Sequence, residues 1–165
     1  MHGHFPAAYI PIEQQPGMIV FRMLLFGEAR GEQDDEGRLE SIAMLAVAST
    51  VLNRSKKSGK TIKEVALQPW AYSTFNINDP NREKLVTAHL IDPVSWERAD
   101  TVCDLVEQGL CKDPTNGSTH YCTSNLWGRE DKTPGKPKWF EKSEIDAGRT
   151  KELARFGHHV FGTAP

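Results

Sequence analysis

Apolar side chains occupy nearly every position of residues 18–26, where Arg22 is the only charged residue. A helix that is apolar on almost all its faces lies in the interior of a domain. Gly27 and Gly31 follow at the point where helices commonly end. The pattern therefore predicts a central helix over residues 18–28. The segment is far too short to span a membrane.

Two further helices follow with recognisable start signals. The acidic residues 34–36 favour the start of a second helix, because negative charge stabilises a helix N-terminus. Small and apolar residues continue this helix to about Arg54. Thr61 and Glu64 form the capping box of a short helix that ends near Gln68.

The rest of the chain alternates between turn signals and short periodic segments. Up to residue 117, the pattern predicts a loop or short hairpin over 68–78, helix starts at Asp79-Pro80 and Asp92-Pro93, a helix through Ala99 to Leu110 and a turn over 113–117. Beyond this turn it predicts a strand over 118–122, a mobile loop over 128–138, a helix near 144–155 and a strand over 159–161. These elements indicate a predominantly helical α+β fold. We expect an irregular N-terminal leader over residues 1–17 and one domain over 18–165.

Composition and charge exclude some classes of function. The chain is 38% hydrophobic and 25% charged, which is ordinary for a globular protein, and its net charge of −2 provides no overall basic field for nucleic acid. A local cluster of Lys132, Lys136, Lys138 and Lys142 suits contact with an anionic polymer. Residues 1–16 lack the basic start and apolar core of a signal peptide, and we expect no stable membrane association.

The cysteines are odd in number and form no C-x-x-C pair. Three thiols in this arrangement suit a reducing compartment better than a disulfide framework, with a Cys103–Cys111 bridge as the lesser alternative.

A set of histidines and cysteines raises the hypothesis of a zinc site; its members are His120, Cys122, His158 and His159, with Cys111 as a further candidate. Zinc sites usually contain tight local ligand pairs, which this set lacks, and neighbouring residues on a strand point to opposite faces. We therefore expect no metal. His120 and His159 are expected to hold hydrogen bonds in or near a cleft.

Glu28 is the first candidate for catalysis, because it directly follows the apolar segment. Desolvation disfavours the charged form of a carboxyl group, so an acid in apolar surroundings can keep its proton and act as a general acid. The alternative is an ordinary helix-terminal acid. Arg30 and Glu32 are expected to pair with each other.

Polar and aromatic residues of the 68–78 segment indicate the wall of a groove, formed by Gln68, Tyr72, Ser73 and Phe75. Amide and hydroxyl groups can bind sugar or peptide, and aromatic faces can stack on sugar rings. The alternative is a small aromatic core beneath a loop. Asn116-Gly117 is either a simple turn or a turn that directs the next strand toward the cleft.

Several motifs, taken in order, resemble one family. They are Gly27-Glu28-Ala29-Arg30-Gly31-Glu32, Val51-Leu52-Asn53-Arg54, Gln68-Pro69 with Tyr72-Ser73, the run from Asp113 to Tyr121, Trp139, and Gly157 to Phe161. This set resembles the cell wall hydrolases of the spore cortex-lytic (SleB) type and covers residues 18–161. The chain departs from the pattern at Cys122, in a longer stretch between Phe75 and Ser95, and in the Lys-rich loop 128–138.

The resemblance implies a lysozyme-like domain with a short β-hairpin or sheet beside the active-site cleft, acting on the glycan strands of peptidoglycan without a cofactor. It implies that Glu28 is the catalytic acid. We expect the substrate to be bound by Glu32, Gln68, Tyr72, Ser73, Phe75, Asn116, His120, Tyr121, Trp139 and His159.

Two chemical routes remain open for cleavage of a β-1,4 bond. A second carboxylate, for which Glu32 is the nearest candidate in sequence, would complete a glycosidase. Without it, the 6-hydroxyl of muramic acid attacks intramolecularly, as in lytic transglycosylases, which are common in the family. We favour the lytic route.

The biological setting expected from these features is a monomeric phage endolysin, with a bacterial cytoplasmic enzyme or a virion-borne enzyme as the alternative. It would stay in the host cytoplasm until another protein releases it to the cell wall or periplasm. Two other classes remain open, namely a non-catalytic peptidoglycan-binding or phage structural protein, and a zinc-dependent amidase or peptidase.

Overall fold

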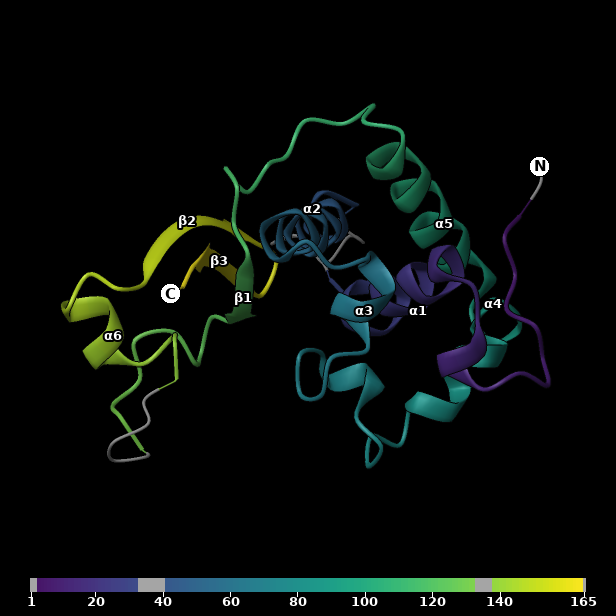
Figure 1. Cartoon of the computed structure of the whole chain (residues 1–165), viewed down its shortest axis with the longest axis horizontal. Coiled ribbons are helices and arrows are strands. Elements are labelled where there is room, and N and C mark those ends of the chain that lie inside the picture. Colours follow the sequence, from purple (N-terminus) through teal and green to yellow (C-terminus); the bar gives the residue numbers. More distant parts are fainter. Residues whose placement is uncertain (1–2, 33–40, 133–137, 165) are drawn as a thin grey trace.

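The computed structural model describes residues 3–32, 41–132 and 138–164. In Figure 1 the helices α1, α3, α4 and α5 lie on one side of the molecule, and a small sheet with α6 lies on the other. Helix α2 (Ser41–Ser58) stands between them and contacts α1, α3 and α5 as well as all three strands. The fold therefore consists of a helical part and a sheet part joined by α2.

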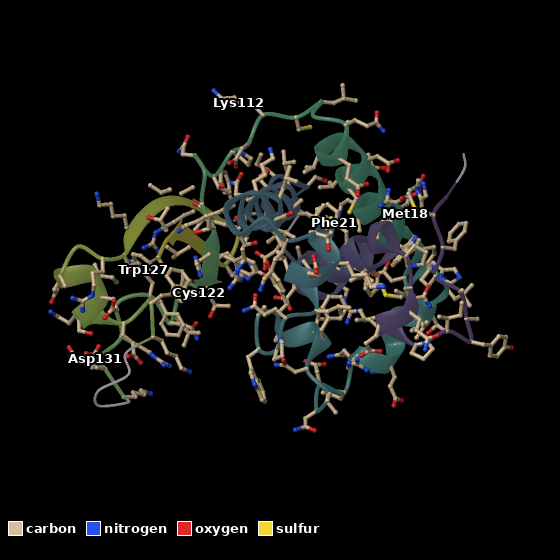
Figure 2. All side chains as sticks on the ribbon, viewed as in Figure 1. Met18, Phe21, Lys112, Cys122, Trp127 and Asp131 are labelled. Carbon is tan, nitrogen blue, oxygen red and sulfur yellow. The ribbon has the colours of Figure 1, made fainter. Side chains whose placement is uncertain are left out.

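The central helix is α1 (Gly17–Ala29), and it confirms the helix predicted from the apolar segment. Its side chains from Ile19 to Phe26 are all buried, among them Phe21, which Figure 2 places in the helical part. Helix α1 contacts α2, α3 (Ile62–Ala66) and α5 (Pro93–Glu107), which explains why its apolar residues cover every face. None of the helices in the described ranges is long and apolar enough to cross a bilayer.

Two of the predicted helix starts are confirmed. Thr61 and Glu64 form the complete capping box of α3, and the Asp92 carboxylate accepts a 3.0 Å hydrogen bond from the Ser95 N–H at the start of α5. Helix α2 ends at Ser58 rather than Arg54, and its predicted start at 34–36 lies outside the described residues. Three short helical elements complete this part: η1 (Ile12–Gln14), η3 (Arg82–Thr87) and α4 (Ala88–Ile91).

Residues 68–78 form a loop that contains the short 3-10 helix η2 (Ser73–Phe75) and no strand. The loop alternative is therefore confirmed over the hairpin. The Asp79-Pro80 signal is followed by η3 rather than by a regular α-helix, and the Asp79 carboxylate accepts a 2.7 Å hydrogen bond from the Asn81 N–H.

The sheet has three antiparallel strands in the order β1-β3-β2. They are β1 (His120–Thr123), β2 (Lys151–Phe156) and β3 (His159–Thr163). The predicted strand over 118–122 thus begins two residues later, and the terminal strand is confirmed. In the register, Tyr121 is opposite Phe161 and Thr123 is opposite His159.

The helix predicted near 144–155 is wrong. Helix α6 (Lys142–Asp146) is short, Gly148 takes a φ of +69°, and the chain then forms β2. Residues 151–155 are mostly strong helix formers, but pairing with β3 overrides their propensity. Part of the loop predicted over 128–138 lies outside the described residues, and so does Lys136.

All three cysteines are free thiols, so no Cys103–Cys111 bridge forms.

Candidate active site

The carboxylate of Glu28, at the end of α1, meets groups from two other parts of the fold. Its Oε1 accepts hydrogen bonds from the Ser73 hydroxyl at 3.0 Å and from the Thr74 N–H at 2.9 Å. Its Oε2 accepts a 2.8 Å hydrogen bond from the Tyr121 hydroxyl on β1. The half-buried side chain therefore lies against neutral polar groups, and not against the purely apolar wall expected from the sequence.

Gly27 allows the loop to approach Glu28. A Cβ atom at this position would lie 2.0 Å from the Thr74 hydroxyl oxygen, a distance that no side chain tolerates. Any larger residue would push η2 away from α1 and break the contact between the Thr74 N–H and Glu28. The glycine before the acid is thus required by the close approach of the Thr74 side chain to α1.

Tyr121 is held by aromatic neighbours from the sheet and from the 68–78 loop. Its ring centroid lies 5.0 Å from that of His159, 5.7 Å from that of Phe161 and 6.1 Å from that of Tyr72. Burial, together with the negative charge of Glu28, raises the pKa of the Tyr121 phenol well above its usual range. The phenol is therefore neutral and serves Glu28 as a hydrogen-bonding partner.

Two cavities adjoin these contacts. The first has a volume of about 150 Å³ and is lined by residues that include Gly27, Ser73, Thr74 and Asp79. The second has a volume of about 200 Å³, and its lining includes the site residues Arg54, Trp70, Tyr72, His120, Tyr121 and Trp139. Glu28 itself lines neither cavity, but the groups that bind its carboxylate do: Ser73 and Thr74 line the first, and Tyr121 lines the second.

The second cavity combines aromatic rings with a single arginine. The His120 and Trp139 ring centroids lie 5.3 Å apart, and the Arg54 guanidinium lies 5.9 Å from the ring centroid of Tyr72. Burial and the positive charges of Arg54 and Lys57 lower the pKa of His120 to about 4. His120 is therefore a neutral hydrogen-bonding group at neutral pH, and its Nδ1 lies 3.0 Å from the Thr119 hydroxyl.

Glu32 is buried and supports the sheet. Its Oε2 accepts a 2.8 Å hydrogen bond from the His158 N–H, and its Oε1 lies 3.3 Å from Nδ1 of His159. A Cβ atom on Gly157 would lie 2.0 Å from Oε2 of Glu32, so this glycine is required for the contact. Burial lowers the pKa of His159, although the negative charges of Glu32 and Glu28 oppose the shift.

The expected pair of Arg30 with Glu32 is not formed between these two described residues. The Arg30 guanidinium lies 4.8 Å from the ring centroid of Phe26, while Glu32 holds the turn before β3. Glu32 also lines neither cavity beside Glu28.

Five of the predicted substrate-binding residues line neither cavity, namely Glu32, Gln68, Phe75, Asn116 and His159. Gln68 is exposed and lines neither of the two cavities. Phe75 is buried and belongs to the hydrophobic core, which matches the alternative of an aromatic core under the loop. Asn116 takes a φ of +55° in the turn before β1, where its side chain lies 3.5 Å from the Leu153 carbonyl oxygen.

The turn at Asn116 is fixed by Asp113, which binds the Thr115 and Gly117 N–H groups and the Asn53 side chain of α2. Burial opposes ionisation of Asp113, but these hydrogen bonds outweigh it and lower its pKa. The turn therefore positions β1 relative to α2 and contributes no side chain to the cavities.

Of the proposed zinc ligands, His120 and Cys122 are separated from His159 by the sheet. His120 and Cys122 lie on one face of β1, whereas Tyr121 lies on the other face, where its ring contacts His159. Cys122, labelled in Figure 2, is buried, and burial raises its pKa to about 11. Within the described ranges, the residues whose ligand atoms gather closely are His4, Asp100 and Asp104, beside the buried Arg22.

Four groups at the candidate site were not predicted from the sequence. The Thr74 N–H is a backbone group and has no sequence signature. Arg54 stood in a motif that carried the family resemblance, yet no role was assigned to it. Asp79 and Trp70 were interpreted as a helix start and as part of a loop, and the structure places them on the two cavities.

Comparisons with known proteins identify related folds and a related sequence family. The family model described as Cell Wall Hydrolase matches residues 40–162, a range that begins after Glu28. No relative was found among curated protein sequences.

Two solved structures are similar over most of this chain. The catalytic domain of the Bacillus cereus SleB protein has a TM-score of 0.52 and 18% identity, with 88% of each chain covered. The catalytic domain of the germination-specific lytic transglycosylase SleB from Bacillus anthracis has the same score and identity, with 94% of this chain and 98% of that chain covered. The expected lysozyme-like, mainly helical fold is confirmed.

Proposed function

The chain belongs to the cell wall hydrolase family, and we propose that it cleaves the β-1,4 bond between N-acetylmuramic acid and N-acetylglucosamine in peptidoglycan, with Glu28 as the catalytic acid. The observation that carries this proposal is the position of the Glu28 carboxyl group. It lies at the end of a buried helix, its contacts are neutral donors, and those donors line two cavities.

The hydrogen bonds of Glu28 indicate which oxygen carries the proton. The Thr74 N–H can only donate, so Oε1 must remain an acceptor. The Tyr121 hydroxyl can either donate or accept, so Oε2 can hold a proton with one hydrogen bond reversed. A glycosidic oxygen that enters the cavity beside Tyr121 would receive this proton.

The lytic route requires no second carboxylate, which agrees with the position of Glu32. Proton transfer from Glu28 breaks the bond between the muramic acid C1 and the leaving oxygen as positive charge develops on the ring. The 6-hydroxyl of the same sugar then bonds to C1, and its proton returns to Glu28, so that no water is consumed and an anhydro sugar is formed. Glu32 is an unsuitable second carboxylate, because it is buried and bound at the turn before β3.

A muramidase is the second candidate, and Asp79 is the observation that favours it. Its half-buried side chain lines the first cavity together with Ser73 and Thr74, which bind Glu28. A carboxylate across a cleft from the acid can activate water, which produces a reducing end.

Mass spectrometry of the fragments released from purified peptidoglycan tests the proposal. We expect disaccharide peptides that end in anhydromuramic acid and are lighter than the hydrolysed products by one water. Reducing ends that disappear in an Asp79→Asn variant would assign the muramidase route. Free stem peptides from an intact glycan would indicate an amidase, and the absence of soluble fragments would indicate a binding protein.

We also propose that the enzyme serves as a phage endolysin that acts from within the host. Such an enzyme would act as a monomer and would wait in the cytoplasm for a membrane lesion. Expression in a bacterium should cause lysis only when a pore-forming protein is expressed with it.

A further inference from the structure

Trp70 occupies a backbone conformation that is unfavourable for a large side chain. The turn Gln68-Pro69-Trp70-Ala71 is closed by a 3.0 Å hydrogen bond from the Ala71 N–H to the Gln68 carbonyl, and Trp70 has a φ of +63°. With proline second and a positive φ third, this turn has the type II pattern, whose third position favours glycine. A tryptophan at this position is strained, and such strain is characteristic of functional sites.

The side chain of Trp70 is also exposed. Its exposed fraction is 81%, whereas Trp96 is buried and Trp127 and Trp139 are half-buried. Burial therefore does not compensate the strain, because the indole contributes little to the hydrophobic core. Because the strain is not compensated by burial, we infer that the exposed ring itself has a function.

Trp70 separates two hollows of the surface. On one side it lines the cavity of about 200 Å³ that contains Tyr121, the partner of Glu28. On the other side it lines a larger groove of about 440 Å³, together with Glu13, Leu67, Pro69, Phe75, Asn76, Ile77, Asn78 and Arg82. The two hollows share Trp70, so a linear polymer that leaves the cavity toward the groove passes over the indole.

We propose that Trp70 is a stacking platform for one hexosamine ring of the glycan strand, next to the bond that is cleaved, and that the groove beyond it holds the continuing strand. This inference rests on the proposed function and names a further substrate contact of the same site. The flat C–H face of a pyranose matches the indole. The amide groups of Asn76 and Asn78 suit the hydroxyl and acetamido groups of the neighbouring sugars. Arg82 is held by Glu13 and by the Phe75 carbonyl and forms part of the groove wall.

The Trp70→Gly variant separates a binding role from a structural role. Glycine fits the positive φ without strain, so the melting temperature should stay the same or rise. Loss of stacking should lower the cleavage rate about tenfold on intact peptidoglycan and on glycan strands freed of stem peptides. Trp70→Phe keeps an aromatic face and should retain most of the rate. Tyr9→Gly, at an exposed aromatic residue outside the described cavities, should leave the rate unchanged.

Two outcomes would overturn the proposal. One is a wild-type rate for Trp70→Gly on both substrates. The other is a loss on intact peptidoglycan with no loss on peptide-free strands, which would assign the groove to the stem peptide.

A fluorescence experiment keeps this proposal separable from the proposed function. Trp70 is the most exposed of the four tryptophans, so iodide quenching reports mainly on it. Peptide-free glycan strands added to the Glu28→Gln variant should protect the fluorescence from iodide, and the Glu28→Gln, Trp70→Phe double variant should lack this response. Unchanged quenching would refute the stacking platform. Failure of the wild type to cleave peptidoglycan would instead refute the proposed function.

Discussion

Arg22 and Glu28 lie on the same helix, yet their surroundings differ in kind. Arg22 is fully buried, and its guanidinium pairs with Asp100, Asp104 and Glu107 of α5. Glu28 is half-buried, and its hydrogen bonds come from two hydroxyl groups and one backbone N–H. The charge of Arg22 is matched by opposite charges, whereas the Glu28 carboxylate is bound by uncharged groups. The first region is structural and the second is suited to catalysis.

The largest effect is expected from Glu28→Gln. The amide keeps the size of the side chain but cannot donate a proton as an acid, so peptidoglycan cleavage should fall roughly 10³-fold. The melting temperature should stay near that of the wild type, because the amide oxygen can still accept from the Thr74 N–H. Turbidity and thermal unfolding measure the two effects. Glu83→Gln, at an exposed residue, is the control and should retain full activity.

Arg22→Met should lower the stability of the protein and leave its cleavage activity nearly unchanged. Removal of the guanidinium leaves three acids facing an apolar side chain, which should lower the free energy of unfolding by about 3–5 kcal/mol. Urea unfolding measures this change. Cleavage by the folded fraction at low temperature should remain close to wild type. A loss of activity without a loss of stability would place Arg22 in the catalytic machinery and break the comparison.

A smaller effect on activity is expected from Tyr121→Phe. The variant removes the hydroxyl that binds Oε2 of Glu28, and one such hydrogen bond corresponds to about fivefold to tenfold in rate. Tyr9→Phe is the matched comparison, because Tyr9 is fully exposed and lines none of the described cavities. The initial cleavage rate of Tyr121→Phe should be lower than that of the comparison variant. Equal rates would mean that the contact of Tyr121 with Glu28 contributes nothing to catalysis.

The smallest effect concerns the stability of the sheet part at low pH. The pKa of His120 is lowered from 6.5 to about 4 in the folded protein, so the unfolded state binds more protons between these values. The free energy of unfolding should therefore fall as the pH is lowered from 6.5 to 4. Urea unfolding at several pH values should show a weaker dependence in a His120→Asn variant. An unchanged slope would assign the effect to other groups.

The sequence was most informative where local patterns and burial agree. The apolar run of α1, the capping box of α3 and the Asp92-Pro93 start of α5 each have a local physical cause. Strand β2 could not be predicted, because its residues favour a helix and form a strand only through pairing with β3.

At the candidate site, too, local patterns predicted some residues, and others depend on the tertiary structure. Glu28 was predicted because an acid after an apolar run is unusual in itself, and Ser73, Tyr72 and Tyr121 were predicted through motifs. The structure brings these four residues together, and their roles stay predictions. Glu32 was expected to bind substrate, but only the tertiary structure shows that it supports the turn before β3. The contributions of the Thr74 N–H and of Asp79 depend on how the loop folds against α1, which no local pattern encodes.

The central claim is that Glu28 supplies a proton to the leaving oxygen. The most direct test is whether the loss of cleavage rate in Glu28→Gln depends on the leaving group. Cleavage by the wild type and by Glu28→Gln is compared on the natural glycan and on an aryl glycoside of N-acetylmuramic acid, whose phenol leaves without protonation. If Glu28 is the acid, the roughly 10³-fold loss on the glycan should shrink to about tenfold or less on the aryl glycoside. Equal losses on both substrates would contradict the claim.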